Sequence, residues 1–305
     1  MTAPPMTYFG GKTLLAERIA AFLPPHAHYV EPFAGSLAVL LAKPRSRMET
    51  VNDLDGHLMT FWRVLRNKPE ELMRVCTLTP HARNEHLTAF DVDLVDLDDL
   101  NDLNDLNDLN VARLTWLKIT QGRSGTLRKT GWRYFVDPKG SSKSMPGYLD
   151  AYVDRMASAA ERLHHVSLEC RPGIEVVQKY GAIEQVCLYV DPPYLGSTRT
   201  NSGYRVDMRD DASHTALIKA LLDARASVVL SGYASDLYDS ALAGWSRIEI
   251  PTITGQGGTK QARVEVIWCN RAMPAATLFD EVPGNRPACT DPSRSRAGDR
   301  TEQKQ

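Results

Sequence analysis

The sequence predicts an α/β protein built around a doubly wound, mostly parallel sheet. The run VCLYV at residues 186–190 is apolar on both faces, which is typical of a strand covered by helices on both sides. Residues 28–41 read as a strand, a glycine turn and a helix, the first unit of such a sheet. Because open α/β sheets bind ligands at the carboxyl ends of their strands, we expect the functional residues there.

Residues 1–66 are predicted to form the first part of the main domain. Residues 13–23 carry apolar side chains at helical spacing, and the Pro-Pro pair that follows ends this helix. Ser36 is a candidate cap for the helix after the glycine turn. The second strand is predicted at 48–52 and leads into another helix.

Three features of this part are candidates for holding a nucleotide-like ligand. The glycines at 10–11 let the backbone approach a ligand and direct amides at a carboxylate, and Lys12 adds positive charge. Gly35 lets a ligand lie against the turn. Asp53 follows a strand about 20 residues later, where a ribose-binding carboxylate belongs in such folds. The alternative role of Asp53 is to cap the next helix, and Asp55 competes for that role.

Residues 67–164 do not continue the sheet pattern and are predicted to be an inserted region, with helices at 68–78 and 146–163. Between these helices, residues 91–110 repeat Asp, Leu and Asn, and leucine recurs at every third position from residue 94 to residue 109. A three-residue period drifts around an α-helix, and Asp and Asn favour turns. We therefore expect an exposed segment that is flexible or only partly ordered. A calcium loop is the alternative, but the repeat lacks the glycine and terminal glutamate of an EF-hand.

The charge of the chain is unevenly distributed. The net charge is −1, but without the eight aspartates of residues 91–110 the chain has 36 basic and 29 acidic residues. Residues 111–143 contain eight basic residues and one acidic residue, and they include the sequence QGRSGTLRKTGWRYF. Lysine and arginine neutralise phosphates, an arginine can pair with guanine, and an aromatic ring can fill the space of an extruded base. The alternative is a solvated basic loop. The candidate DNA-binding residues are Arg123, Arg128, Lys129 and Arg133.

Residues 165–275 resume the alternation of strands and helices. Strands are predicted at 166–169, 186–190, 227–231, 247–250 and 262–270, and helices at 173–180, 212–222 and 237–242. The polar loop at 195–211 is long enough to close over a ligand, with Arg199 and Tyr204 as candidate contacts. Residues 276–305 lose periodicity and are predicted to be a disordered tail.

The corner Asp191-Pro192-Pro193-Tyr194 is the main candidate for chemistry. Two prolines donate no backbone hydrogen bonds and hold the chain extended after the strand. The Asp191 carboxylate, the carbonyls of Asp191 and Pro192 and the ring of Tyr194 are then available to a ligand. An exocyclic amine on a nucleobase has two N–H donors beside a flat ring, so acceptors next to an aromatic side chain match it. An ordinary strand-ending Pro-Pro turn is the alternative.

Together with YFGGK at 8–12 and VEPFAG at 30–35, this corner resembles the motifs of Dam-type DNA adenine methyltransferases. The resemblance runs through most of residues 7–270 and is weak between about 60 and 165. It implies a methyltransferase sheet with an antiparallel closing strand. It also implies a catalytic domain formed by 1–66, which binds the cofactor S-adenosylmethionine, and 165–275, with target recognition in 67–164. Leu37 departs from the pattern, because relatives often carry a second glycine there, which leaves the loop conformation open. The implied residues are Tyr8, Lys12, Gly35, Asp53 and Asp191 for the cofactor, and Asp191, Pro192 and Tyr194 for catalysis.

The function that follows is methyl transfer to the exocyclic amine of an adenine flipped out of double-stranded DNA. Alternatives are the same chemistry on cytosine, and a non-catalytic DNA-binding protein with this fold. RNA or a protein glutamine is a less favoured acceptor. No Pro-Cys dipeptide occurs, so carbon-5 methylation of cytosine has no candidate nucleophile.

Composition adds expectations about location and partners. The five cysteines form no CxxC pair and no zinc-spaced cluster with histidine, so we expect reduced thiols and no metal. No apolar stretch is long enough to span a bilayer, and the start lacks a signal sequence, so we expect a cytoplasmic monomer without membrane contact. The recognised DNA sequence and the biological role, whether restriction, protection of viral DNA or strand marking, stay open.

Overall fold

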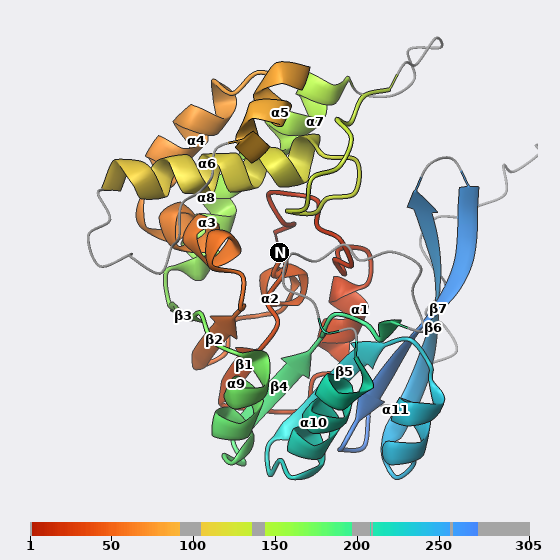
Figure 1. The fold of residues 1–305 in the computed structure, drawn as a ribbon. Helices are drawn as coiled ribbons and strands as arrows, with labels where there is room; N and C mark the ends of the chain where they lie inside the picture. The colour runs from red at the N-terminus through yellow and green to blue at the C-terminus, as the bar shows by residue number, and fades with distance from the viewer. Residues whose placement is uncertain are drawn as a thin grey trace, which may run out of the picture. The chain divides into compact units, whose positions relative to one another are not determined.

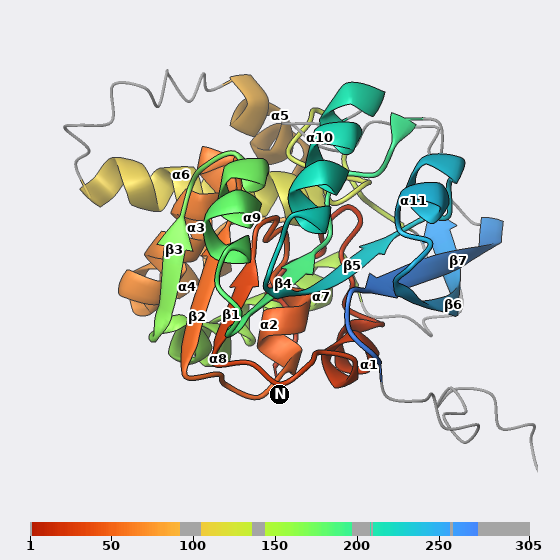
Figure 2. The ribbon, with the colours of Figure 1, turned by 90° about the horizontal axis from the view of Figure 1, so that it is seen from below.

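A seven-stranded sheet lies at the centre of the fold (Figure 1). The computed structural model describes residues 2–91, 105–135, 144–196, 208, 210–256 and 259–273, which belong to one compact unit. The strand order is β3-β2-β1-β4-β5-β7-β6, and the strands are seen in this order across Figure 2. The strands are β1 (His28–Glu31), β2 (Met48–Asn52), β3 (Val166–Glu169), β4 (Val186–Val190), β5 (Ser227–Gly232), β6 (Ser246–Gln256) and β7 (Thr259–Cys269).

The direction of the strands confirms the predicted fold class. Every neighbouring pair from β3 to β5 is parallel, and β7 runs antiparallel to both β5 and β6. From β1 the chain moves outward through β2 to β3, and it later returns to place β4 on the other side of β1, with His28 opposite Val186. The boundary between β1 and β4 is therefore the topological switch point, where sheets of this kind bind ligands.

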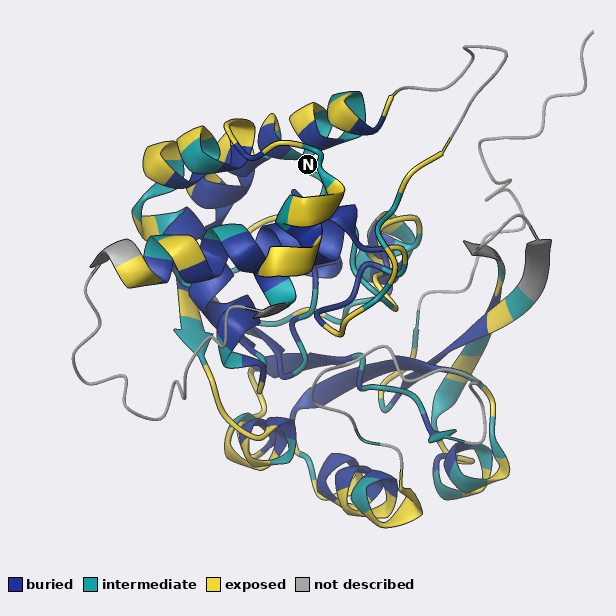
Figure 3. Cartoon of the chain, turned by 45° about the horizontal axis from the view of Figure 1, so that its top comes forward, coloured by how far each residue is buried: buried dark blue, intermediate teal, exposed yellow. Residues whose placement is uncertain are grey.

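Helices cover both faces of the sheet, and β4 is buried along its whole length. Val186, Leu188 and Val190 pack with α9, α10 and α11, which lie in a row below the sheet in Figure 3. Cys187 and Tyr189 point to the opposite face, toward α1, α2, α3 and α8. No helix in the described ranges is long and apolar enough to cross a membrane. The helices of these two layers are α1 (Ala16–Ala21), α2 (Ala38–Ala42), α3 (Gly56–Asn67), α8 (Met156–Leu163), α9 (Gly173–Gly181), α10 (Asp211–Leu222) and α11 (Asp236–Ala241).

The segment between β2 and β3 is helical and packs around α3. It adds α4 (Pro69–Thr77), α5 (Arg83–Asp91), α6 (Asp105–Gln121) and α7 (Met145–Val153), and α6 packs against α3, α4 and α5. The Trp116 indole N–H of α6 donates to the carbonyl of Pro5 at 3.0 Å, which joins this helix to the start of the chain. The sequence did not predict α5 or α6, and the single helix predicted at 146–163 is two helices, α7 and α8.

The structure differs from the prediction at the end of the Asp/Leu/Asn repeat. α6 begins at Asp105, inside the repeat, and Asp108 is only 9% exposed. Both oxygens of Asp108 accept hydrogen bonds from the Arg63 guanidinium of α3, at 2.7 and 3.0 Å. Burial of the residues that follow, such as Trp116, stabilises the helix despite the poor helix propensity of Asp and Asn. Residues 92–104 of the repeat, Arg199, Tyr204 and the tail at 276–305 lie outside the described residues.

Candidate active site

A cleft of about 240 Å³, partly open to solvent, lies at the carboxyl ends of β1 and β4. Its lining comes from the loop before α1, the turn after β1, the end of β2, the start of α9 and the corner after β4. The structure therefore brings together in one cleft the residues that the sequence assigns to the cofactor: Tyr8, Lys12, Gly35, Asp53 and Asp191.

The turn after β1 is held closed around Gly35. Its N–H donates to Asp53 Oδ2 at 3.0 Å, and its carbonyl accepts from the Trp62 indole at 3.1 Å. The φ angle of Gly35 is 48°, and a Cβ atom at this position would lie 3.2 Å from the Tyr8 ring. Both the backbone angle and this close approach therefore favour glycine.

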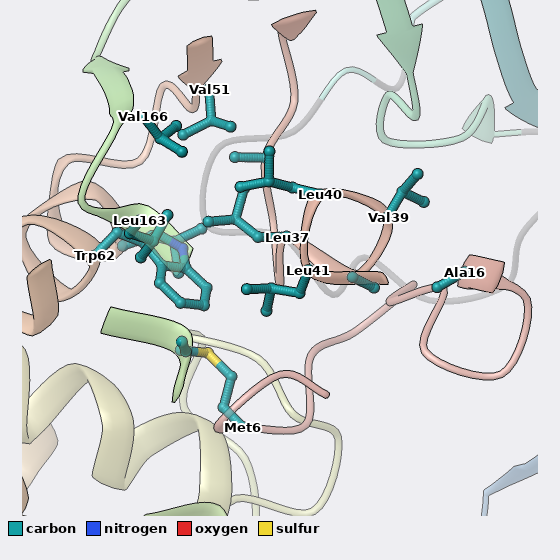
Figure 4. Close-up of a cluster of buried hydrophobic side chains, with 14 of the residues drawn as sticks. Met6, Ala16, Leu37, Val39, Leu40, Leu41, Val51, Trp62, Leu163 and Val166 are labelled. Atoms are coloured by element: carbon teal, nitrogen blue, oxygen red, sulfur yellow. The ribbon is translucent and has the colours of Figure 1, made fainter. Parts of the chain in front are cut away.

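Leu37 settles the question of the loop conformation. It adopts φ 55° and ψ 28°, the left-handed region that a glycine would occupy without strain. Its side chain is fully buried in the same cluster as Trp62 and Leu163 (Figure 4). The N-cap of α2 is Leu37, so the prediction that Ser36 caps this helix is wrong.

The two aspartates after β2 have different partners. Asp55 caps α3, because its Oδ1 accepts from the N–H groups of His57 and Leu58 at 3.0 and 3.3 Å. Asp53 instead lines the cleft and accepts from the N–H groups of Gly35 and Asp55, each at 3.0 Å. Burial raises the pKa of Asp53 to about 6, against the lowering effect of these backbone hydrogen bonds. The cap role belongs to Asp55, and the Asp53 carboxylate faces the cleft.

The corner after β4 is joined to the first loop of the chain. The Lys12 ammonium, 7% exposed, donates to both oxygens of Asp191 at 2.9 Å and to the Gly10 carbonyl at 2.9 Å. The Tyr194 hydroxyl donates toward Asp191 Oδ1 at 3.2 Å and lies 2.5 Å from Glu265 Oε1. The proline corner and the loop before α1, 179 residues apart in sequence, thus form one charged cluster.

A family model for the D12 class N6 adenine-specific DNA methyltransferases matches residues 8–254, from the loop before α1 to β6. The chain belongs to this family. It is therefore an enzyme that methylates adenine in DNA, which decides against the cytosine alternative and the non-catalytic alternative. A search of curated proteins finds no match.

Solved structures give only distant similarities to this methyltransferase. Precorrin 8W decarboxylase from Methanobacterium thermoautotrophicum is 9% identical, with a TM-score of 0.36, over 89% of this chain and 100% of that one. The rRNA methyltransferase AviRa from Streptomyces viridochromogenes is 11% identical, with a TM-score of 0.29, over 83% of this chain and 81% of that one. At these scores neither structure informs the function of the methyltransferase.

Two residues of the proline corner, Pro192 and Tyr194, lie beside the cleft rather than in its lining. Pro193 lines the cleft, and Pro192 is buried next to it. The Tyr194 ring packs edge-on against Tyr233 at 4.6 Å, and the Lys12 ammonium lies 4.9 Å from its centre. The Tyr233 ring and the Lys12 ammonium thus hold the ring of Tyr194 in place.

Two buried glutamates at the site, Glu31 and Glu265, were not predicted from the sequence. Glu31 lines the cleft at the end of β1 and is 2% exposed; its Oε1 accepts from the Tyr29 hydroxyl at 2.6 Å and the Leu40 N–H at 2.8 Å. Burial raises the pKa of Glu31 to about 7. Glu265 of β7 is 4% exposed and contacts Tyr194. The available signals were a glutamate directly after Tyr29 and Val30 in β1 and a glutamate between Val264 and Val266 in β7.

The predicted DNA-binding residues lie on a short hairpin after α6. Arg133 N–H donates to the Gln121 carbonyl at 2.7 Å, and Arg123 N–H donates to the Gly131 carbonyl at 3.0 Å. Arg123, Arg128 and Lys129 are exposed, and Arg133 is half-buried with its guanidinium 5.8 Å from the Tyr148 ring. The hairpin contacts the loop that lines the cleft, because the Gly125 carbonyl accepts from the Phe9 N–H at 2.8 Å.

Other basic residues of the segment 111–143 contact side chains of the helical layer and are not available to DNA in the same way. Arg113 donates to Glu85 at 2.7 Å within the helical layer, and Lys118 is only 7% exposed, with its ammonium 5.1 Å from the Phe90 ring. The Trp132 ring stacks on His81 at 4.4 Å, whereas Tyr134 and Phe135 are 51% and 41% exposed. In the described ranges, no group of three or more His, Cys, Asp or Glu side chains could hold a metal ion.

Proposed function

We propose that this methyltransferase binds S-adenosylmethionine in the cleft and that Asp191 orients the amine of a flipped adenine beside it. The observation that carries the proposal is the Lys12–Asp191 contact, because it places the proline corner in the same cleft as Gly35 and Asp53. A cofactor site and an amine acceptor that share one cleft are what direct transfer between two bound molecules requires.

The residues of the cleft fit S-adenosylmethionine. Asp53 would accept hydrogen bonds from ribose hydroxyls, and its pKa of about 6 leaves it mostly ionised at pH 7. The backbone at 10–11 and the charge of Lys12 suit a carboxylate, and Gly35 permits close approach under the Tyr8 ring. The bound cofactor supplies a methyl group made electrophilic by a sulfonium. No covalent enzyme intermediate is required for its direct displacement.

At the acceptor, the adenine amine is a poor nucleophile because its lone pair is delocalised into the ring. The Asp191 carboxylate and the Pro192 carbonyl would accept its two hydrogens, which favours a pyramidal nitrogen and directs the lone pair toward the cofactor. Tyr194 would present its ring to the base, with its position fixed by the contacts to Tyr233 and Glu265.

Double-stranded DNA would contact the hairpin that follows α6. Arg123, Arg128, Lys129 and Arg133 would neutralise phosphates near the cleft, because the Gly125 carbonyl ties the hairpin to the loop that contains Lys12. Extruding the target adenine costs a few kcal/mol, and these phosphate contacts would offset that cost. A DNA substrate also favours the cytoplasmic location expected from the sequence; action as a monomer remains part of the proposal.

The test is the transfer of radiolabelled methyl groups to unmethylated DNA by purified variants. Asp191→Ala should abolish incorporation while the circular dichroism spectrum stays that of the wild type. The matched control is Asp223→Ala, which should methylate normally. Asp223 is exposed at the end of α10, just before β5 begins, and so lies near the amino ends of the strands rather than the carboxyl ends. Near-normal turnover by Asp191→Ala would refute the role of this carboxylate.

A further inference from the structure

Glu265 connects two of the proposed active-site residues from a strand that neither of them occupies. It lies on β7, is 4% exposed, and its Oε1 is 2.5 Å from the Tyr194 hydroxyl. The same oxygen is 3.6 Å from Lys12 Nζ. Lys12 Nζ itself lies 2.9 Å from each oxygen of Asp191, so the ammonium sits between two carboxylates and is closer to Asp191.

This arrangement creates a conflict for the proposed reaction. Both Asp191 oxygens accept from Lys12. Each keeps a second lone pair, but an adenine amine that binds there shares an acceptor whose charge the ammonium already compensates. An ammonium that is 7% exposed cannot leave Asp191 for an apolar site, because an unpaired buried charge is strongly unfavourable. A shift of about 0.7 Å, from 3.6 to 2.9 Å, would give Lys12 the same distance to Glu265 that it now has to Asp191.

We propose that Glu265 is a positioning residue for methyl transfer: it receives the Lys12 ammonium when the adenine amine takes its place on Asp191. This inference depends on the proposed role of Asp191. The hydrogen bond to Tyr194 fixes the receiving carboxylate, so the ammonium moves to a preformed partner. The amine can then approach Asp191 without leaving a buried charge unpaired.

The electrostatics of the cluster agree with this role. The groups that face Glu265 are Lys12 from the first loop, Asp191 and Tyr194 from the corner, and Tyr189 from β4. Burial, opposed by Lys12 and reinforced by Asp191, raises the pKa of Glu265 above its ordinary value. Only ionised Glu265 can receive the ammonium, so its contribution to kcat should be lost as the pH falls through this raised pKa.

The variant that tests the proposal is Glu265→Gln, which keeps the shape and an acceptor for Tyr194 but removes the charge. We expect kcat for DNA methylation to fall on the order of 10- to 100-fold. Calorimetric affinity for S-adenosylhomocysteine should be unchanged, as should KM for S-adenosylmethionine. Glu265→Asp, which restores the charge, should recover part of the lost kcat. The matched control is Glu249→Gln, because Glu249 on the neighbouring β6 is exposed and pairs with Arg247.

Wild-type turnover by Glu265→Gln would overturn the inference, as would a Glu265→Asp variant no more active than Glu265→Gln. Neither result would touch the proposed function, which fails only if Asp191→Ala remains active. A structure of the wild-type protein with DNA and S-adenosylhomocysteine gives a second measurement that does not depend on how the variants fold. We expect Lys12 Nζ within about 3.2 Å of Glu265 there. Retention of both present Asp191 contacts, with Glu265 still beyond hydrogen-bonding distance, would also overturn the proposal.

Discussion

Replacing Leu37 tests whether the loop under the cofactor cleft is strained in the native protein. Leu37 combines a left-handed backbone with a fully buried side chain, two effects of opposite sign. Left-handed backbone costs a non-glycine residue about 1–2 kcal/mol. Removing a buried leucine side chain down to alanine costs about 2–5 kcal/mol. We therefore expect Leu37→Ala to lower the free energy of unfolding by about 2–5 kcal/mol.

Leu37→Gly loses nearly the same contacts but relieves the strain, so its loss in free energy of unfolding should be smaller than that of Leu37→Ala by about 1–2 kcal/mol. Glycine should thus be the more stable of the two variants, although the greater entropy of its unfolded chain reduces the difference. Leu40 provides the control, because it is equally buried but lies inside α2. There the order should reverse, with glycine about 1 kcal/mol less stable than alanine.

The measurement is equilibrium unfolding in urea followed by circular dichroism, with the free energy extrapolated to water. The order of the two variants decides the question, because the lost side chain affects both nearly equally. If Leu37→Gly is less stable than Leu37→Ala, as at Leu40, the loop carries no backbone strain. The reasoning about the missing glycine would then be refuted, whatever the absolute stabilities are.

Three further predictions concern the cofactor, the packing of the cleft and DNA. Affinity for S-adenosylhomocysteine, measured by calorimetry, should weaken as the pH falls below 6, because Asp53 with its raised pKa becomes protonated, and Asp53→Asn should remove most of this pH dependence. Gly173→Ala places a Cβ 2.5 Å from the Phe33 ring and should destabilise the protein by about 1–3 kcal/mol in urea unfolding, whereas Gly244→Ala meets nothing within 4 Å and should be neutral. Arg128→Ala should weaken DNA binding similarly for all sequences and reduce the slope of log affinity against log salt by about 1, so an unchanged slope would show that this residue contacts no phosphate.

The strands of the sheet could be predicted from the sequence because the residues that favour each strand lie within the strand itself. β1, β2, β3 and β4 have the predicted bounds. β4 is a continuous apolar run, and the other three are short mixtures of apolar and polar residues that end at a polar residue. The same local signal placed Asp191 at a strand end. It could not choose between Asp53 and Asp55, because both follow β2 and only the position of Gly35 separates their roles.

α6 could not be predicted in this way because it is stabilised by contacts with residues far away in the sequence. Its first residues come from a repeat with poor helix propensity, and the helix forms where Trp116 and its neighbours pack against α3 and the start of the chain. Arg63, which pairs with Asp108, lies 45 residues earlier in the sequence. The short stretch of sequence from which a helix is predicted contains neither Arg63 nor the residues against which Trp116 packs.

Glu265 shows the same limit at the active site, and the direction of β7 explains why. In a parallel strand only the last residue reaches the carboxyl edge of the sheet, as Glu31 does on β1. β7 runs the other way, and Val266 pairs with Gly232 at the carboxyl end of β5. Glu265, just before Val266, therefore lies in the middle of its own strand and yet at the edge where Asp191 lies. The antiparallel closing strand thereby brings a second carboxylate to Lys12 without a loop, on a rigid element suited to hold a positioning residue.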